Sequence, residues 1–207
     1  MKDYPSIPQS IGQKFVELPN AFVFDKLDGS SMRSEWSRKR GWYKHGKRQG
    51  LIDDSNPHLA QVPALFDELL AEALTKLAVD HRWQHLIVFH EFWGPRSFAG
   101  RHEAGDDFRL TVFDAAADKK GIMGPAEFIE TFYERGVDVP RFLGRHNWTR
   151  GFVEEVCEGR VDGITFEGVV GKMGTQHDVI RAKAKTKAWL DKVRAQYGPE
   201  ADRIINS

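Results

Sequence analysis

The sequence has 207 residues, of which 41% are hydrophobic and 29% are charged, and this balance is typical of one globular domain with a substantial core. Thirty basic residues offset thirty acidic ones, so net charge alone does not indicate a nucleic-acid-binding protein. The apolar runs are too short to span a bilayer, and the first residues lack the apolar segment of a secretory signal. The single cysteine, Cys157, excludes an internal disulfide. We therefore expect a cytoplasmic protein with no membrane partner.

Apolar alternation and helical spacing predict a series of strands and helices with no linker or repeat between them. In chain order they are strand Ala21–Asp25, helix Pro63–Ala78, strand Leu86–Phe92, strand Phe108–Ala115, helix Pro125–Arg135, helix Gly151–Glu158, strand Ile164–Lys172, strand Val179–Lys185 and helix Thr186–Tyr197. Strands with helices between and after them are typical of an α+β domain with mainly antiparallel sheets. We expect residues 1–207 to form this single domain.

A lysine stands where the first predicted strand gives way to a turn. Lys26 follows an apolar run and precedes Asp28 and Gly29, so its amine would project from the end of the strand. A lysine in such a place can attack a phosphorus atom and hold a nucleotide covalently when cations and a metal surround it. The Lys-x-Asp-Gly pattern is short, so its weight depends on the rest of the chain.

A segment rich in basic and aromatic residues follows, and only Glu35 opposes its basic side chains. Its members are Arg33, Arg38, Lys39, Arg40, Lys44, His45, Lys47 and Arg48, with Trp36, Trp42 and Tyr43 among them. Two interpretations stay open. The segment is either a hairpin whose cations are merely solvated, or a positive aromatic surface that contacts a triphosphate or a polynucleotide backbone.

The last predicted strand alternates between charged and apolar residues. In an extended chain Arg181, Lys183 and Lys185 lie on one face, while the apolar residues between them lie on the other. Three like charges repel one another, which favours an anionic partner such as the phosphates of a nucleotide. The alternative is an exposed strand whose cations prevent pairing at a sheet edge.

Two carboxylates and one ring lie within predicted strands. Burial of Glu167 is costly unless its carboxylate binds a cation, which could be a magnesium ion shared with phosphate oxygens or a neighbouring lysine. Glu91, at the end of another apolar strand, could accept hydrogen bonds from ribose hydroxyls. Phe113 offers a ring for stacking on a base, although a phenylalanine in a strand also packs readily in a core.

Other chemistries lack their motifs. His81 and His85 are four residues apart, but there is no His-Glu-x-x-His and no pair of cysteines for zinc. No Gly-x-Ser-x-Gly elbow of a hydrolase is present. Neither a P-loop nor a Gly-x-Gly-x-x-Gly turn occurs, so we do not expect a P-loop or Rossmann nucleotide site.

Taken in order, six segments resemble the motifs of the covalent nucleotidyltransferase superfamily of polynucleotide ligases and mRNA capping enzymes. They are Lys26-Leu27-Asp28-Gly29-Ser30, Gly46-Lys47-Arg48-Gln49-Gly50, Phe89-His90-Glu91-Phe92-Trp93-Gly94, Val112-Phe113-Asp114, Phe166-Glu167-Gly168-Val169-Val170 and Ala182-Lys183-Ala184-Lys185-Thr186. Ser31 stands where DNA ligases and capping enzymes usually have an arginine, and the Glu-Gly-Val-Val and Lys-x-Lys-Thr segments also look like RNA ligase versions. The chain is therefore most similar to the nucleotidyltransferase domain of an ATP-dependent RNA ligase.

This resemblance implies an α+β nucleotidyltransferase (adenylation) domain of the ATP-grasp-like ligase type, with mainly antiparallel sheets flanked by helices. It also implies three steps: lysyl-AMP forms from ATP, AMP moves to a polynucleotide 5′-phosphate, and a 3′-hydroxyl then attacks that end and releases AMP. The first step needs a neutral lysine amine, which neighbouring cations and the metal are expected to favour. The implied cofactors are ATP and Mg²⁺ (or Mn²⁺), and the implied partner is RNA, as a nicked duplex or as single-strand ends.

The resemblance implies a role for each matching residue. These roles are nucleophile for Lys26, orientation of the nucleophile region for Asp28, phosphate binding for Lys183 and Lys185, metal binding for Glu167, ribose binding for Glu91, adenine stacking for Phe113, and ribose or polynucleotide binding for Arg48. Nucleic-acid binding is expected of Arg33, Arg38, Arg40 and Lys44, and of the loop Gly100–Asp107.

The part of the chain after Leu190 resembles no OB-fold or other clamp module, so a partner protein is expected to complete nucleic-acid binding. Three alternatives stay open: a DNA ligase, a GTP-using guanylyltransferase, and a nucleotide- or RNA-binding module that does not seal.

Overall fold

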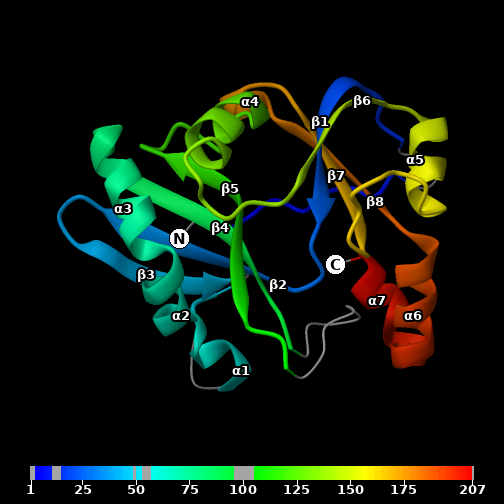
Figure 1. Ribbon diagram of the computed structural model, residues 1–207, viewed down its shortest axis with the longest axis horizontal. Helices are drawn as coiled ribbons and strands as arrows, with labels where there is room; N and C mark the ends of the chain where they lie inside the picture. Colours follow the sequence, from blue (N-terminus) through cyan, green and yellow to red (C-terminus); the bar gives the residue numbers. More distant parts are fainter. Residues whose placement is uncertain (1–2, 11–14, 49, 53–56, 96–104, 207) are drawn as a thin grey trace.

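The computed structural model describes residues 3–10, 15–48, 50–52, 57–95 and 105–206, which form two four-stranded sheets with helices packed against them (Figure 1). Every pairing between strands is antiparallel within the described residues. The predicted α+β class with mainly antiparallel sheets is confirmed.

The first sheet, called sheet A here, has the strand order β6-β1-β7-β8. Its strands are β1 (Leu18–Lys26), β6 (Phe142–Trp148), β7 (Gly168–Met173) and β8 (Ile180–Lys185), and helix α5 (Arg150–Cys157) packs against its apolar residues. The register places Gly168 opposite Lys26 on one side and opposite Lys185 on the other. Two lysines from different strands are therefore brought to the same edge of sheet A.

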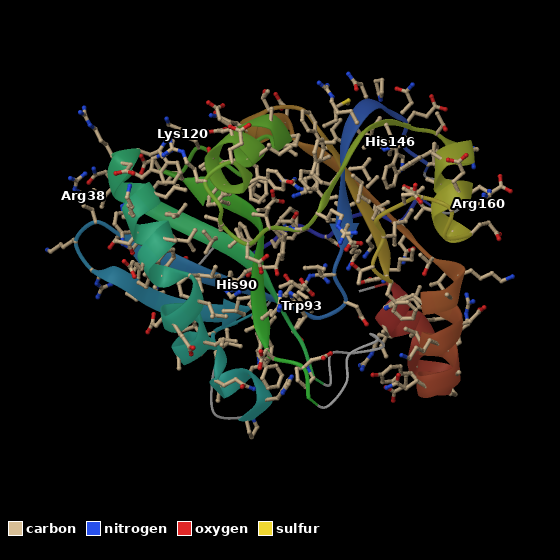
Figure 2. The ribbon with its side chains drawn as sticks, viewed as in Figure 1. Arg38, His90, Trp93, Lys120, His146 and Arg160 are labelled. Atoms are coloured by element: carbon tan, nitrogen blue, oxygen red, sulfur yellow. The ribbon has the colours of Figure 1, made fainter. Side chains whose placement is uncertain are left out.

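The second sheet, called sheet B, has the order β3-β2-β4-β5. Its strands are β2 (Ser30–Ser37), β3 (Gly41–Lys47), β4 (His85–Trp93) and β5 (Arg109–Ala117). The basic, aromatic segment of the sequence is thus the hairpin β2–β3, and Arg38 in its turn lies at the outer edge of the molecule (Figure 2). Met32, Trp36 and Val88 of this sheet form the main core with the helices that cover it.

Helices α1 (Pro57–Ala60), α2 (Val62–Leu69) and α3 (Ala71–Asp80) lie beside sheet B, where Phe66 and Leu74 enter the main core (Figure 1). The helix predicted over 63–78 is therefore two helices, because the backbone leaves helical geometry at Leu70. The helix predicted over 125–135 is α4 (Pro125–Phe128) followed by a π-helical turn (Ile129–Tyr133). Both corrections concern local backbone geometry and leave the apolar faces in the core.

The last helices, α6 (Lys187–Tyr197) and α7 (Ala201–Asn206), pack on one another around Trp189 and Val193. Helix α6 begins where predicted because the hydroxyl of Thr186 accepts a hydrogen bond from the Trp189 amide at 3.1 Å. Within the described part of the chain, no helix is both long enough and apolar enough to cross a membrane.

Strands in sheet A differ from the prediction in two places. Strand β7 begins at Gly168 rather than at residue 164, because Gly168 has a φ of 148° and a Cβ there would lie 2.0 Å from the carbonyl oxygen of Ala184. Glu167 therefore precedes the strand instead of lying within it. Strand β6 was not predicted, since glycine and polar residues interrupt its apolar pattern.

Candidate active site

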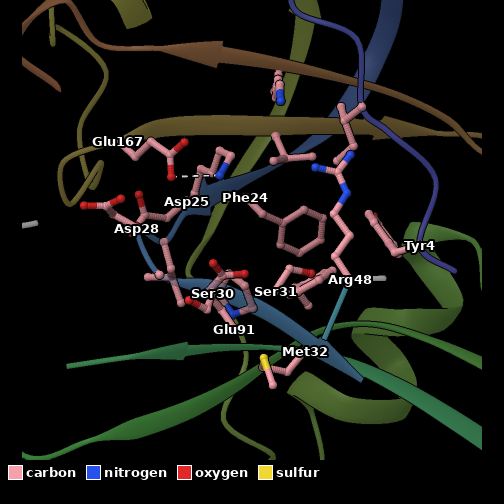
Figure 3. A pocket seen from close by; sticks show the side chains of 18 of the residues that line it. Tyr4, Phe24, Asp25, Asp28, Ser30, Ser31, Met32, Arg48, Glu91 and Glu167 are labelled. Carbon is pink, nitrogen blue, oxygen red and sulfur yellow. Dashed lines mark hydrogen bonds and ion pairs between the residues drawn. The ribbon is translucent and has the colours of Figure 1, made fainter. Parts of the chain in front are cut away.

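A cavity of about 710 Å³ opens between sheets A and B (Figure 3). Its volume lies within the range of roughly 300–1,000 Å³ that is usual for small-molecule sites. The structure brings every residue with a predicted nucleotide or catalytic role to the wall of this one cavity. These residues are Lys26, Asp28, Arg48, Glu91, Phe113, Glu167, Lys183 and Lys185.

The turn after β1 carries the chain from sheet A to sheet B. Gly29 lies in this turn, and a Cβ on Gly29 would come within 2.4 Å of the carbonyl oxygen of Phe92. Only glycine therefore allows β2 to start so close to the end of β4. The Asp-Gly pair of the sequence motif is thus explained by packing, and the close approach places Glu91 of β4 near Lys26.

Lys26 is largely enclosed, with 22% of its side chain exposed, and its Nζ donates to Oε2 of Glu167 at 2.7 Å (Figure 3). Burial acts to lower the pKa of Lys26, but the carboxylates of Glu167, Glu91 and Asp28 act in the opposite direction and leave that pKa above its ordinary value. The protein groups alone therefore hold this amine protonated. The expectation that neighbouring cations favour the neutral amine is corrected here, because carboxylates are its nearest charged neighbours.

Glu167 is 4% exposed and lies between two lysines, with Oε1 at 3.0 Å from Nζ of Lys185 and Oε2 on Lys26. Among the described residues, no cluster of three or more His, Cys, Asp or Glu side chains could form a metal cage on its own. Mg²⁺ and Mn²⁺ accept oxygen ligands from one or two carboxylates together with substrate phosphates. The carboxylates that surround Lys26 fit that ligand chemistry, with Glu167 as the predicted ligand.

Lys183 and Lys185 both line the cavity, as strand alternation predicts, while Ala182 and Ala184 lie in the core of sheet A. Lys185 is saturated by protein groups: it contacts Glu167, donates to the carbonyl of Ile205 at 3.2 Å, and lies 4.0 Å from the ring centre of Trp189. Burial, with the like charges of Lys185 and Lys26, lowers the pKa of Lys183 to about 8.

Lys183 differs from the other buried lysines in its lack of a partner. It is 4% exposed, yet no carboxylate in the described part of the chain lies within 4.0 Å of its Nζ. The Nζ of Lys183 lies at the cavity wall and is not fully enclosed by protein. An anionic ligand in the cavity would therefore meet an ammonium that no described carboxylate contacts.

Glu91 is half-buried at the sheet B side of the cavity. Burial raises its pKa to about 8, with Lys26 acting to lower it and Glu167 acting to raise it further. The same carboxyl group acts as a negative charge on Lys26, and its oxygens can accept hydrogen bonds. Such a group is suited to a hydroxyl-rich ligand.

Phe113 is half-buried and lines the far end of the cavity, where the ring of Tyr4 meets it edge-on at 5.1 Å. Lys172 fixes this end, since its Nζ donates to the carbonyl of Phe113 at 2.6 Å and lies 3.0 Å from Oδ1 of Asp114. The hydroxyl of Tyr4 donates to Oδ2 of the same carboxylate at 2.5 Å.

Sequence reasoning missed both Tyr4 and Lys172. The sole charge in the apolar strand β7 was a signal for Lys172, whereas nothing local marked Tyr4.

Arg48 extends into the cavity beside Tyr4 (Figure 3). Its backbone is held by Arg33, whose guanidinium donates to the carbonyl of Arg48 at 3.1 Å and to that of Gly50 at 3.4 Å. Arg33 is 3% exposed and also pairs with Asp3. These contacts assign Arg33 a structural role in holding the loop, and the nucleic-acid contact expected of it stays a prediction.

Lys47, at the end of β3, also lines the cavity, whereas Arg38, Arg40 and Lys44 are not among its lining residues. Arg38 and Arg40 are exposed in the turn, and Arg40 lies 4.9 Å from the ring centre of Tyr43. Lys44 lies 5.4 Å from the same ring and 4.0 Å from Glu35. The cations around Tyr43 form a basic, aromatic patch on sheet B. Residues 100–104 of the predicted binding loop lie outside the described residues.

Comparison with known proteins gives matches among solved structures only. No protein-family profile and no curated protein matches this sequence. An archaeal ATP-dependent RNA ligase superposes with a TM-score of 0.69 at 15% identity, covering 100% of this chain and 56% of that one. A protein from Aquifex aeolicus assigned as an ATP-dependent DNA ligase superposes with a TM-score of 0.68 at 21% identity, covering 100% of this chain and 58% of that one.

A lysine-to-methionine variant of Naegleria gruberi RNA ligase, solved with AMP and manganese, superposes with a TM-score of 0.59 at 17% identity. That match covers 84% of this chain and 52% of the ligase. The chain thus spans between 52% and 58% of the length of these three ligases. The chain has the fold of the nucleotidyltransferase domain of ATP-dependent polynucleotide ligases, as its six sequence motifs predict.

Proposed function

We propose that this protein is an ATP-dependent RNA ligase domain that works through a covalent lysyl-AMP on Lys26. The observation that carries the proposal is Lys183, which lies with Lys26 on the wall of a nucleotide-sized cavity and which pairs with no carboxylate of the described residues. A phosphate group would supply the anion that Lys183 lacks and would bring its phosphorus atom to the nucleophile.

The first step follows from the contacts of Lys26. Its ammonium gives up a proton, and Oε2 of Glu167, at 2.7 Å, is the base within reach. The neutral amine attacks the α-phosphorus of ATP, so that a bond forms from Nζ to phosphorus while the bond from phosphorus to the bridging oxygen breaks. Pyrophosphate leaves with that electron pair, and Nζ loses its second proton to the pyrophosphate or to water, which gives the phosphoramidate. Lys183 and Lys185 stabilise the charge on the departing pyrophosphate.

The metal has a defined place in this proposal. When bound, Mg²⁺ or Mn²⁺ would neutralise charge on the phosphate oxygens. Glu167 would hold it with those oxygens, as the carboxylate donors around Lys26 allow. The Naegleria gruberi ligase structures with AMP or ATP and manganese support the same pairing of nucleotide and metal here.

The remaining substrate contacts follow the predicted roles. Glu91 would bind the ribose, Phe113 would stack on adenine, and Arg48 would contact the ribose or the polynucleotide. Asp28 would orient the nucleophile region. The surface patch of Arg40 and Lys44 around Tyr43, with Arg38 nearby, is proposed to bind RNA, as a nicked duplex or as single-strand ends.

RNA rather than DNA as the sealed strand is supported by Ser31, which stands at the position of the usual arginine of DNA ligases, and by the RNA ligases of the same fold. A partner protein would complete nucleic-acid binding. The DNA ligase alternative is kept open by the similarity to the Aquifex aeolicus protein.

The decisive experiment is incubation with Mg²⁺ and α-labelled ATP, followed by a denaturing gel and intact mass measurement. Wild type and Lys76→Ala should both acquire one covalent AMP, since Lys76 is an exposed lysine paired only with Asp80 on α3. Lys26→Ala should acquire none while keeping its thermal unfolding transition. A labelled Lys26→Ala protein would overturn the proposal, and so would a wild type that neither labels nor carries AMP from purification. GTP in place of ATP, and RNA nicks beside DNA nicks, separate the remaining alternatives.

A further inference from the structure

Asp25, the residue directly before Lys26, makes contacts with a segment that Lys26 does not touch through the same face of β1. Alternation along β1 places the Asp25 side chain on the face opposite to that of Lys26. Asp25 is 3% exposed, and its backbone amide donates to the carbonyl of Arg141 at 2.9 Å. Its Oδ1 accepts from the amide of Thr165 at 2.9 Å, and its Oδ2 accepts from the Thr165 hydroxyl. One side chain on β1 thus satisfies two donors of a single distant residue.

Thr165 lies two residues before Glu167, in a stretch between α5 and β7 that has no ladder hydrogen bonds of its own. The opposite side of this stretch is held by Thr186, whose hydroxyl donates to the carbonyl of Phe166 at 2.7 Å and whose amide donates to the carbonyl of Glu167 at 2.9 Å. The segment 165–167 is therefore fixed from both sides. At the end of this segment, the carboxylate of Glu167 lies between Lys26 and Lys185.

A buried aspartate is an unfavourable choice for a strand residue unless its contacts matter. Burial raises the pKa of Asp25, and the hydrogen bonds from Thr165 act against that rise. An apolar or β-branched side chain at this position would suit strand β1 at lower cost. We propose that Asp25 and Thr165 form a clamp that positions Glu167 relative to Lys26, so that Asp25 is a positioning residue for lysyl-AMP formation. This inference rests on the proposed function.

The test measures two quantities for each variant: the single-turnover rate constant of lysyl-AMP formation and the dissociation constant of ATP. Asp25→Ala and Thr165→Val should each slow adenylation roughly 10- to 100-fold, as expected for loss of a charge-assisted hydrogen bond, with ATP affinity changed less than about twofold. Asp25→Asn and Thr165→Ser should recover most of the rate, because an amide can accept from the Thr165 amide and donate to its hydroxyl oxygen. The double variant should be no slower than the slower single variant.

Val23→Ala serves as the matched control, since Val23 is fully buried on the same face of β1 and its side chain, being apolar, makes none of the hydrogen bonds of the clamp. It should lower thermal stability and leave the adenylation rate of the folded protein unchanged. If Val23→Ala slows adenylation as much as Asp25→Ala at equal destabilisation, the effect is general and the inference is overturned. Wild-type rates in Asp25→Ala and Thr165→Val would also overturn it.

Hydrogen exchange gives a readout that does not depend on adenylation. The amides of Thr165 and Thr186 report on the clamp and on the carbonyl of Glu167, respectively. Loss of protection at both amides in Asp25→Ala supports the clamp, and unchanged protection overturns it. A wild type that forms no lysyl-AMP would refute the proposed function, while this measurement would still decide whether Asp25 fixes the segment that carries Glu167.

Discussion

Of the cations on strand β8, the half-buried Arg181 and the buried Lys183 lie in opposite electrostatic situations. Nε of Arg181 lies 3.3 Å from Oδ2 of Asp114, and Lys172 holds the other oxygen of that carboxylate. Lys183, two residues further on, lies among like charges, and no carboxylate of the described chain pairs with it. Both oxygens of Asp114 are thus neutralised by cations of the protein, whereas the ammonium of Lys183 faces the cavity, where the proposed function would place an anion.

The largest effect on adenylation should come from a substitution of Lys183. Lys183→Met removes the ammonium and keeps the shape, so adenylation should fall roughly 100- to 1,000-fold, as when one preorganised donor is lost from an active site. Thermal stability should stay the same or rise, because an uncompensated buried charge is removed. Single-turnover labelling and thermal unfolding measure the two quantities. A clear loss of stability would show that Lys183 has a structural partner after all.

A substitution in the cluster around Asp114 should lower the stability of the protein. Lys172→Met leaves Asp114 buried with one cation fewer, and breaking such a pair should reduce the free energy of unfolding by about 3 kcal/mol. Urea denaturation gives this value directly. If Lys172→Met were as stable as wild type while Lys183→Met unfolded readily, the contrast between the two clusters would be reversed.

Nucleotide binding should depend on pH through the charge of Lys183. Lys183 has a pKa of about 8, lowered by burial, so it is charged below pH 8 and loses its charge above it. The dissociation constant of ATP should therefore rise above pH 8, by up to about tenfold per pH unit. Lys183→Arg should remove most of this rise, because a guanidinium stays charged. Isothermal titration between pH 7 and pH 9.5 would reveal it, and equal pH profiles for both proteins would contradict it.

A third cluster, formed by Ser34, His45 and His90 in sheet B, should make the stability of the protein depend on pH under acidic conditions. The hydroxyl of Ser34 lies 2.9 Å from Nδ1 of His45 and 3.0 Å from Nε2 of His90. Burial lowers the pKa of His90 to about 3, below the value of an unfolded histidine, so its contribution is full above pH 6.5 and declines as the pH falls towards 3. At pH 5.5 the loss should be about 1.4 kcal/mol. His90→Gln should unfold with a smaller dependence on pH over this window; an unchanged slope would contradict the assignment.

The motif residues on strands were predictable because strand geometry is local. Alternation alone placed Lys183 and Lys185 on one face, and the change from apolar run to Asp-Gly marked the strand end at Lys26. The contact between Lys26 and Glu167 spans 141 residues and depends on the register of β1 with β7, which no local pattern encodes.

Contacts that join distant segments account for what was missed. Tyr4 meets Asp114 across 110 residues, and its own neighbourhood in the sequence gives no sign of a site. Arg33 has the same appearance in the sequence as the exposed Arg38, because burial within a hairpin is decided by what packs on it. The break at Leu70 likewise lies between two helices, α2 and α3, whose apolar residues both enter the main core.

The turn around Gly29 divides the reaction machinery unequally between the two sheets. Lys26, Lys183 and Lys185 lie in strands of sheet A, and Glu167 directly precedes another, whereas Glu91 and Phe113 lie in sheet B. Asp114 of sheet B is held by Lys172 and Arg181 of sheet A, so the two sheets cannot separate about this turn unless that ion-pair cluster breaks. On the proposed function, the groups around the α-phosphate and those around the nucleoside would thus be locked together across the cavity.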